Sequence, residues 1–358
     1  MEQRDPAITV MKALAIVCMV SGHAFTGTQW EWLVGMFHMP LFFFCSGYCF
    51  KERYLSDGWC FVRRKMRTLW WPTFLWVGAM VLLHNILIDI GLLQVGSAGP
   101  MAVHRYDWTD TARYLLMATL LHSHAPVFAG VWFIKALIVA NLMGFVLIRH
   151  GRGPRLYIHM VTMLALSIAM TALIHQHIPV IDFAHVPFLS TFFLLAGYAA
   201  KRARLFDRIG HLPAYAVGLP CAALLLCGYC WWPSNMLLSI TAPACVPYGL
   251  SALSGIVLMY LLSRILLRCT AGMRVQAILE YMGNHTYSIL MMHALCFKLV
   301  SLLLIYVYAL PHSHLADFPV IHHMAIHGYA LAYTAVGIAL PLAIHWGYRQ
   351  LCHGRCAQ

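Results

Sequence analysis

The sequence predicts an all-α polytopic membrane protein with about ten transmembrane helices. Of its 358 residues, 61% are hydrophobic and only 10% are charged, and the mean hydropathy is +0.72. This composition excludes a water-soluble globular chain of such length. Apolar stretches long enough to cross a hydrocarbon core of about 30 Å recur along the chain. The ten predicted spans cover residues 8–28, 31–50, 70–93, 126–148, 155–174, 186–201, 213–232, 243–268, 284–309 and 323–348.

The connections between these spans alternate in charge, which supports the even number of helices. Lysine and arginine collect on the cytoplasmic side, and 19 of the 24 lie before the first span or in the turns after the second, fourth, sixth, eighth and tenth, with the span ends that border these turns included. The outer connections hold only Arg105 and Arg113. Lys12, Lys135 and Lys298 fall inside predicted spans. We therefore expect both termini in the cytoplasm, and topology explains the net charge of +12 without a nucleic-acid partner.

No low-complexity tract, internal repeat or long linker interrupts the chain. We expect one transmembrane domain over residues 1–358 with no fused soluble domain. The longest outer connection runs from about residue 94 to 125, and its segment Tyr114–His122 is predicted to form a short interfacial helix that could line an entrance.

The first span carries two ionisable residues that a bilayer makes costly. Such residues usually mark a function. Lys12 and His23 are eleven positions apart, so one helix separates them by roughly 16 Å along its axis, about half of the hydrocarbon core. One helix thus presents a cation toward one side and a base toward the other. Glu31 and His38 follow on the outer side and are candidates to orient His23 or to contact a substrate.

The turn after the second span is strongly basic, from Arg63 to Pro72. Arg64 and Arg67 stand at i and i+3 of a helical face, where two guanidinium groups can hold phosphate oxygens. The alternative is a positive-inside anchor, with Trp70 and Trp71 in the aromatic belt of the membrane. Composition does not choose between them.

Lys12 with His23, the segment Phe37–Tyr48 and the turn Arg63–Pro72 together resemble the integral-membrane acyltransferase-3 family. Trp132-Phe133 and the segment His285–His293 support the resemblance. Lys12 resembles the fucose 4-O-acetylase branch of sugar O-acetylases, in which a lysine is usual at this position. That branch often has an acidic residue three positions before the lysine, whereas this chain has Thr9.

The resemblance implies transfer of an acetyl group from cytoplasmic acetyl-CoA to a hydroxyl of a cell-surface or lipid-linked saccharide or glycolipid. It implies a multi-pass protein of a plasma membrane, here a bacterial inner membrane, in contact with lipid, with acetyl-CoA as co-substrate and no permanently bound cofactor or metal. His23 would act as general base, because an imidazole with an ordinary pKa of about 6.5 can accept a hydroxyl proton. The predicted catalytic set is His23, Glu31 and His38; the predicted donor-binding set is Lys12, Arg64, Arg67, Trp132 and Lys135; and Ser288 and His293 are predicted to support the site.

Direct attack of the acceptor on the thioester is the preferred order, and an acyl-His23 relay stays open. Trp132, Lys135, Asn141, Ser288 and His293 are expected to face the bundle interior, because a polar group facing lipid is costly.

Three alternatives remain. The same fold could transfer succinyl or another acyl group, or the chain could be a nonenzymatic membrane subunit. Histidine pairs near the outer side also suggest a metal or proton transporter, although Asp89 is the only carboxylate within a predicted span besides Glu31 at the first residue of the second. These histidines are His122 and His124, His175 and His177, His312 and His314, and His322, His323 and His327.

Overall fold

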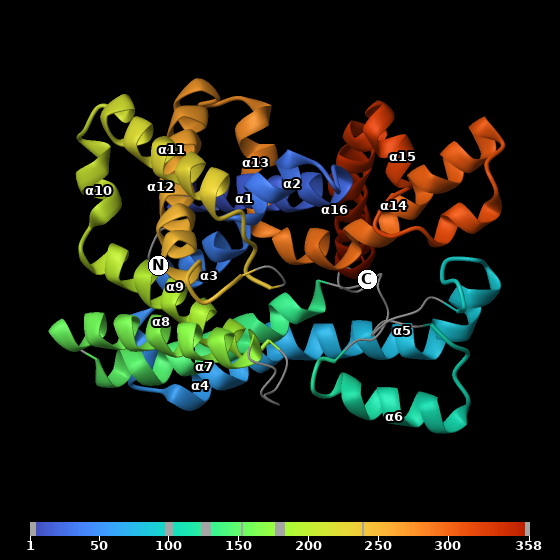
Figure 1. Cartoon of the computed structure of the whole chain (residues 1–358), viewed down its shortest axis with the longest axis horizontal. Helices are drawn as coiled ribbons and strands as arrows, with labels where there is room; N and C mark the ends of the chain where they lie inside the picture. The colour runs from blue at the N-terminus through green and yellow to red at the C-terminus, as the bar shows by residue number, and fades with distance from the viewer. Residues whose placement is uncertain are drawn as a thin grey trace. The chain divides into compact units, whose positions relative to one another are not determined.

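The computed structural model describes residues 5–96, 103–122, 130–151, 153–175, 183–237 and 240–354. Within these ranges the regular elements are all helices, and Figure 1 traces them in chain order. The first ten are α1 (Pro6–Ala24), α2 (Gln29–Gly35), α3 (His38–Tyr48), η1 (Glu52–Leu55), α4 (Gly58–Lys65), the π-helical η2 (Met66–Trp70), α5 (Trp71–Asp89), α6 (Trp108–Ala118), α7 (Val131–His150) and α8 (Pro154–His175). They are followed by α9 (His185–Arg202), α10 (Leu205–Gly210), α11 (Ala214–Trp231), α12 (Cys245–Cys269), α13 (Arg274–Asn284), α14 (Thr286–Tyr308), η4 (His312–Ala316), α15 (His322–Met324), η5 (Ala325–Tyr329) and α16 (Ala330–Gly354).

Eight stretches of the described helices are long and apolar enough to cross a membrane, which confirms the all-α polytopic class. The predicted second and sixth spans are also helical but do not meet both conditions. The second divides into α2 and α3 at Phe37, where φ is −137°. Pro40 explains the break, because proline has no N–H to continue the hydrogen bonding of α2 yet fits the first turn of a new helix. The sixth is α9, which closes on the charged pair Lys201 and Arg202.

The chain forms two compact units, each described here by itself. The first contains α1 up to Met19, the helices α2 to α4, and the chain from Ala136 in α7 to the end of α13. The second contains residues 20–28, residues 65–135 and the chain from His285 onward. Helix α1 contributes to both units.

Backbone contact through glycine builds the first unit. Figure 1 shows α3 beside α9, and a Cβ atom placed on Gly47 would lie 1.8 Å from the carbonyl oxygen of Leu194. A Cβ atom on Gly197 would lie 2.0 Å from the carbonyl oxygen of Phe44. Only glycine permits so close an approach of two helices, and small residues commonly bring membrane helices together in this way.

The second unit is built around α14 and α16, which lie together in orange and red in Figure 1. The hydroxyl groups of Ser301 and Tyr333 join the two helices at 3.0 Å. Gly337 packs against the ring of Phe297 and against Val20 of α1, so the end of α1 belongs to this contact.

Helices α1 and α14 are the most enclosed of the candidate spans. In their most apolar stretches, 78% and 67% of the residues are buried, against 11% in α11. Polar side chains on α1 and α14 therefore face protein far more than lipid, and these two helices carry Lys12, His23, Ser288 and His293 of the candidate site.

Candidate functional site

The rings of His23 and His293 stack in the second unit. His23 lies in the last turn of α1 and His293 near the start of α14, with ring centroids 5.4 Å apart and ring planes 22° from parallel. His293 is buried, whereas His23 is partly accessible. The structure thus brings together the predicted base and one of the two residues predicted to support it.

The hydrogen bonds of His293 define its tautomer. Its Nδ1 lies 2.9 Å from the carbonyl oxygen of Leu290 and 3.1 Å from that of Ile289. Carbonyl oxygens only accept, so Nδ1 carries the hydrogen and donates it. The rings of Phe297 and His293 are nearly perpendicular, with centroids 5.6 Å apart, and Phe297 in turn packs against Tyr333. His293 is therefore a fixed surface against which the His23 ring lies.

A second polar group occupies the amino end of α14. Oγ of Ser288 lies 3.3 Å from Nδ1 of His345 on α16, and the ring of His345 lies 4.6 Å from that of His285. The neighbouring Tyr287 shares a 2.9 Å hydrogen bond with Thr73 of α5. Ser288 thus has a histidine partner, but that partner is His345.

A buried lysine joins α14 to the segment that follows it. The ammonium group of Lys298, whose residue is 3% exposed, donates to the backbone carbonyl of Asp317. The carboxylate of Asp317 in turn accepts from Nδ1 of His314 at 2.8 Å. A buried ammonium group requires such partners. Lys298 therefore ties residues 311–321 to the helix that carries His293.

Lys12 lies in the first unit, in the middle of α1. It is partly buried, and its ammonium group lies near Cys45 of α3. The turns of α1 on either side belong to an apolar core shared with α3, α9 and α12. At Thr9 the backbone of α13 approaches closely, because a Cβ atom on Gly283 would lie 2.0 Å from the Thr9 carbonyl oxygen.

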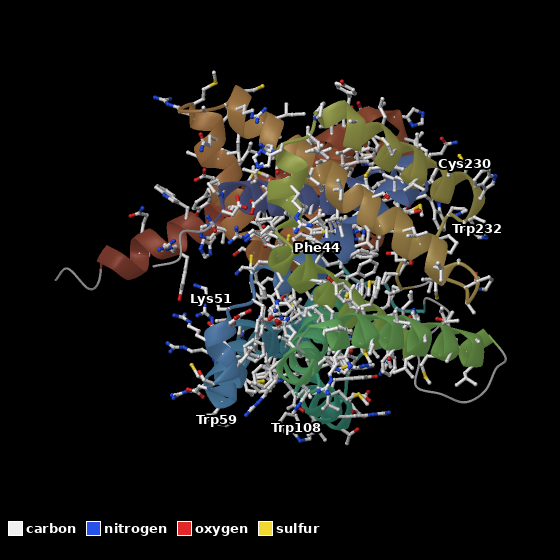
Figure 2. All side chains as sticks on the ribbon, turned by 90° about the vertical axis from the view of Figure 1, so that its left-hand side faces the viewer. Phe44, Lys51, Trp59, Trp108, Cys230 and Trp232 are labelled. Atoms are coloured by element: carbon white, nitrogen blue, oxygen red, sulfur yellow. The ribbon has the colours of Figure 1, made fainter. Side chains whose placement is uncertain are left out.

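Arg64 projects from α4 at the surface of the first unit, 6.0 Å from the ring of Tyr54. Phe61 of α4 is buried and stacks on Phe145 at 5.1 Å, which anchors α4. In Figure 2, Trp59 of α4 points outward while Phe44 lies within the packed side chains. Arg67 lies beyond α4, in the π-helical η2, and is assigned to the second unit.

Glu31 and His38 both belong to the first unit, on α2 and α3. Nδ1 of His38 donates to the carbonyl oxygen of Val34 at 2.6 Å. His38 therefore serves the junction between α2 and α3, and its Nε2 is the acceptor of the neutral ring.

Trp132 and Lys135 lie on α7, in the part assigned to the second unit. Trp132 is partly buried, with its ring 6.2 Å from that of Phe133. Lys135 is exposed, so the expectation that it faces the interior was wrong. Its four-carbon stem lets the ammonium group reach past apolar surface toward polar surroundings. Burial, and then the charge of Lys135, lower the pKa of His122, so the two side chains are near each other.

Asn141, by contrast, faces the interior as predicted. It is 2% exposed and accepts a 3.0 Å hydrogen bond from Ser46.

Among the histidines that suggested a metal site, His314 and His323 lie together, with ring centroids 5.3 Å apart. In the part of the chain that the structure describes, no group of three or more histidine, cysteine, aspartate or glutamate side chains is placed to hold a metal ion. His124 and His177 lie outside the described residues, as does the side chain of His175.

Two residues of the site were missed or undervalued in the sequence. His345 was not predicted, although it is an ionisable residue within an apolar span, as His293 is. Lys298 was predicted to lie inside a span, but no role was predicted for it. Their partners Ser288 and Asp317 are 57 and 19 positions away, so local spacing could not reveal them.

Comparison with known proteins identifies the family of the chain. Residues 5–346 match the acyltransferase-3 family, in which the matched segment is described as an acyltransferase domain. A search of curated proteins and a search of solved structures each returned no match. The match covers nearly the whole chain and includes both compact units. The protein is a membrane acyltransferase of the acyltransferase-3 family.

Proposed function

We propose that the protein transfers an acetyl group from cytoplasmic acetyl-CoA to a hydroxyl of a cell-surface or lipid-linked saccharide. The stacked pair His23 and His293 is the observation that carries this proposal. Acyl transfer to a hydroxyl needs a base that removes the proton as the oxygen attacks the carbonyl carbon. His23 supplies it, because its ring is partly accessible and has a defined neighbour.

His293 keeps His23 in a productive orientation. With Nδ1 committed to two backbone carbonyls, its ring cannot rotate without losing both bonds while buried. A ring held in this way limits the positions open to the imidazole stacked on it. Fixing a catalytic group in this manner is a principal source of rate enhancement, since a small misplacement can cost about 100-fold.

The donor side follows from the family membership and the basic residues. Arg64, Arg67 and Lys12 are proposed to bind the phosphates of the coenzyme, and Trp132 and Lys135 to contact the donor. Arg64 and Arg67 are both exposed, as a contact with a cytoplasmic ligand requires. Glu31 and His38 are proposed to orient His23 or to contact the acceptor. We also propose that the protein belongs to the fucose 4-O-acetylase branch, in which a lysine at the position of Lys12 is usual.

The proposed setting is a bacterial inner membrane with both termini in the cytoplasm. This places the basic α4 on the side of the soluble coenzyme, and Arg105 and Arg113 on the side of the glycan.

The test is acyl transfer by the full-length protein in lipid nanodiscs. Acetyl-CoA and succinyl-CoA would be supplied separately with a saccharide fraction from the cell envelope, and modified hydroxyls detected by mass spectrometry. We expect acetyl esters on the saccharide, formed from acetyl-CoA. Transfer of succinyl alone would reassign the donor, and absence of transfer from both donors would contradict the proposal.

A further inference from the structure

The amino end of α14 holds a hydroxyl and an imidazole that the proposed function leaves unused. Oγ of Ser288 and Nδ1 of His345 are 3.3 Å apart, and both side chains are partly buried. A serine hydroxyl becomes a nucleophile when a base within hydrogen-bonding reach can take its proton. Such distances are often at the long end of the range before a substrate is bound.

The base of this pair is itself oriented. The ring of His285, 4.6 Å away and 49° from parallel, lies against the ring of His345 and limits its rotation. Nδ1 of His345 can accept a proton from Ser288 only when the hydrogen of the neutral ring is on Nε2. The arrangement is thus a nucleophile, a base and a third group that positions the base.

Helix α5 fixes the same turn of α14 from another direction. The hydroxyl of Thr73 donates to the carbonyl oxygen of Leu69 at 2.7 Å. Because that hydroxyl has one hydrogen, the 2.9 Å bond to Tyr287 must be donated by the tyrosine. Tyr287 adjoins Ser288 in the chain, so the backbone of the nucleophile is held by α5 while its side chain meets α16.

This contact also connects the pair to the donor side. Arg67 precedes Thr73 by six residues, roughly 9 Å along a helix. All of these residues belong to the second unit. Arg349, one helical turn after His345 on the same face of α16, adds a further exposed cation. A donor whose phosphates bind these cations would bring its thioester toward Ser288.

We propose that Ser288 is a transient acyl carrier that receives the acyl group from the thioester donor before the saccharide does. The inference rests on the proposed function and replaces direct attack by a two-step route. In the first step Oγ of Ser288 attacks the thioester carbonyl carbon while its proton passes to Nδ1 of His345. The carbon–sulfur bond breaks, and the coenzyme thiolate leaves with that proton as the free thiol.

The second step returns the enzyme to its starting state. The saccharide hydroxyl attacks the Ser288 ester while His23 takes its proton, and the bond between the acyl carbon and Oγ of Ser288 breaks. The proton held by His23 is then returned to the Ser288 oxygen. No oxidant, reductant or further co-substrate is needed.

The test is covalent labelling of the full-length protein in nanodiscs with acetyl-CoA in the absence of acceptor, followed by peptide mass spectrometry. We expect an acetyl ester on Ser288. When the saccharide is then added, this ester should be lost from wild type and persist in His23→Ala, because the second step lacks its base there. Ser288→Ala should carry no label at this site, and His345→Ala should label about 100-fold more slowly. Ser301→Ala is the matched control, since its hydroxyl on the same helix bonds to Tyr333 and its loss should leave labelling unchanged.

Two results separate failure of this inference from failure of the proposed function. If acceptor acetylation proceeds while Ser288 carries no ester in wild type or in His23→Ala, or if the label is on His23, the acyl-serine route is wrong and the proposed function stands. If wild type neither releases the coenzyme nor acetylates any saccharide, the proposed function itself fails. Ser288→Cys guards against misfolding of the alanine variant, because an acyl-carrying cysteine would form a thioester that neutral hydroxylamine releases.

Discussion

Orientation of the His23 imidazole is the residue-scale feature on which the proposed chemistry depends. Its stacking on His293 allows a direct test. His293→Phe keeps an aromatic ring at the position, whereas His293→Ala removes it. We expect the alanine variant to lose about 10- to 100-fold in kcat with little change in the Kd for acetyl-CoA, because the base is mispositioned while donor binding is intact.

His293→Phe should recover most of that loss. Equal activities of the two variants would show that ring contact is not the role of His293. Steady-state kinetics in nanodiscs, with both proteins confirmed as monodisperse, makes the comparison.

Sequence reasoning identified His23, His293 and Ser288 because polar groups are costly inside a bilayer. It did not pair Ser288 with His345, since that contact joins helices far apart in sequence. It also misjudged Lys135, because a long flexible side chain can reach polar surroundings from a membrane helix. The cost of burying a polar group singles out candidate residues in the sequence, whereas the partner of each residue depends on how the helices pack.

At the scale of elements, glycine contacts set the packing of α3 against α9. Gly47→Ala and Gly197→Ala would each push a methyl group into a backbone carbonyl, at 1.8 Å and 2.0 Å. Backbone cannot move aside as a side chain can, so we expect each variant to lose about 1–3 kcal/mol or more. Thermal unfolding in detergent should show a clearly lowered midpoint.

The matched control is Gly218→Ala on α11, whose added methyl group would lie an ordinary 3.6 Å from Leu261. Alanine is favoured over glycine within a helix by about 0.5–1 kcal/mol, so this variant should unfold at the wild-type temperature or above. A Gly47→Ala protein that unfolds together with the control would refute the close approach.

The tether from Lys298 to Asp317 gives a second prediction for an element. Lys298→Met removes a buried charged hydrogen bond of about 1.5–3 kcal/mol, so residues 311–321 should exchange backbone hydrogen roughly 10- to 100-fold faster. Hydrogen exchange with mass spectrometry measures this.

Lys201→Met is the control, because Lys201 also donates to a carbonyl, that of Phe50, but in the first unit. It should leave residues 311–321 unchanged. Equal exchange of that segment in wild type and Lys298→Met would mean that other contacts hold it.

The length of each apolar stretch is enough to predict the positions of most helices, and the structure agrees with these predicted positions. The break between α2 and α3 does not follow from apolar length, although Pro40 and Gly35 stand inside the predicted span. The high apolar content of residues 31–50 led to the prediction of one continuous span. Where a helix ends depends instead on backbone hydrogen bonding, which proline interrupts. The predicted interfacial helix begins earlier than expected, at Trp108, because the Asp107 carboxylate caps it by accepting from the Asp110 amide at 2.7 Å.

At the scale of the whole molecule, the charge pattern predicts the orientation in the membrane. A fluorescent protein fused after residue 358 should fluoresce, since we expect the C-terminus in the cytoplasm. Alkaline phosphatase fused after residue 120, in the longest outer connection, should be active, because it requires the extracytoplasmic side. If the phosphatase were active when fused at the C-terminus, the orientation would be the opposite of the predicted one. The basic α4 would then lie on the side away from cytoplasmic acetyl-CoA.

The family membership establishes acyl transfer, and we propose that His23 carries out its proton transfer. The most direct measurement uses purified protein in lipid with acetyl-CoA labelled in the acetyl group, following coenzyme release and acetyl transfer to saccharide in wild type, His23→Ala and the control His159→Ala on α8. We predict that His23→Ala transfers about 10²- to 10⁴-fold more slowly while still binding acetyl-CoA, and that the control retains wild-type rates. A correctly inserted His23→Ala protein with full transfer activity would contradict the account.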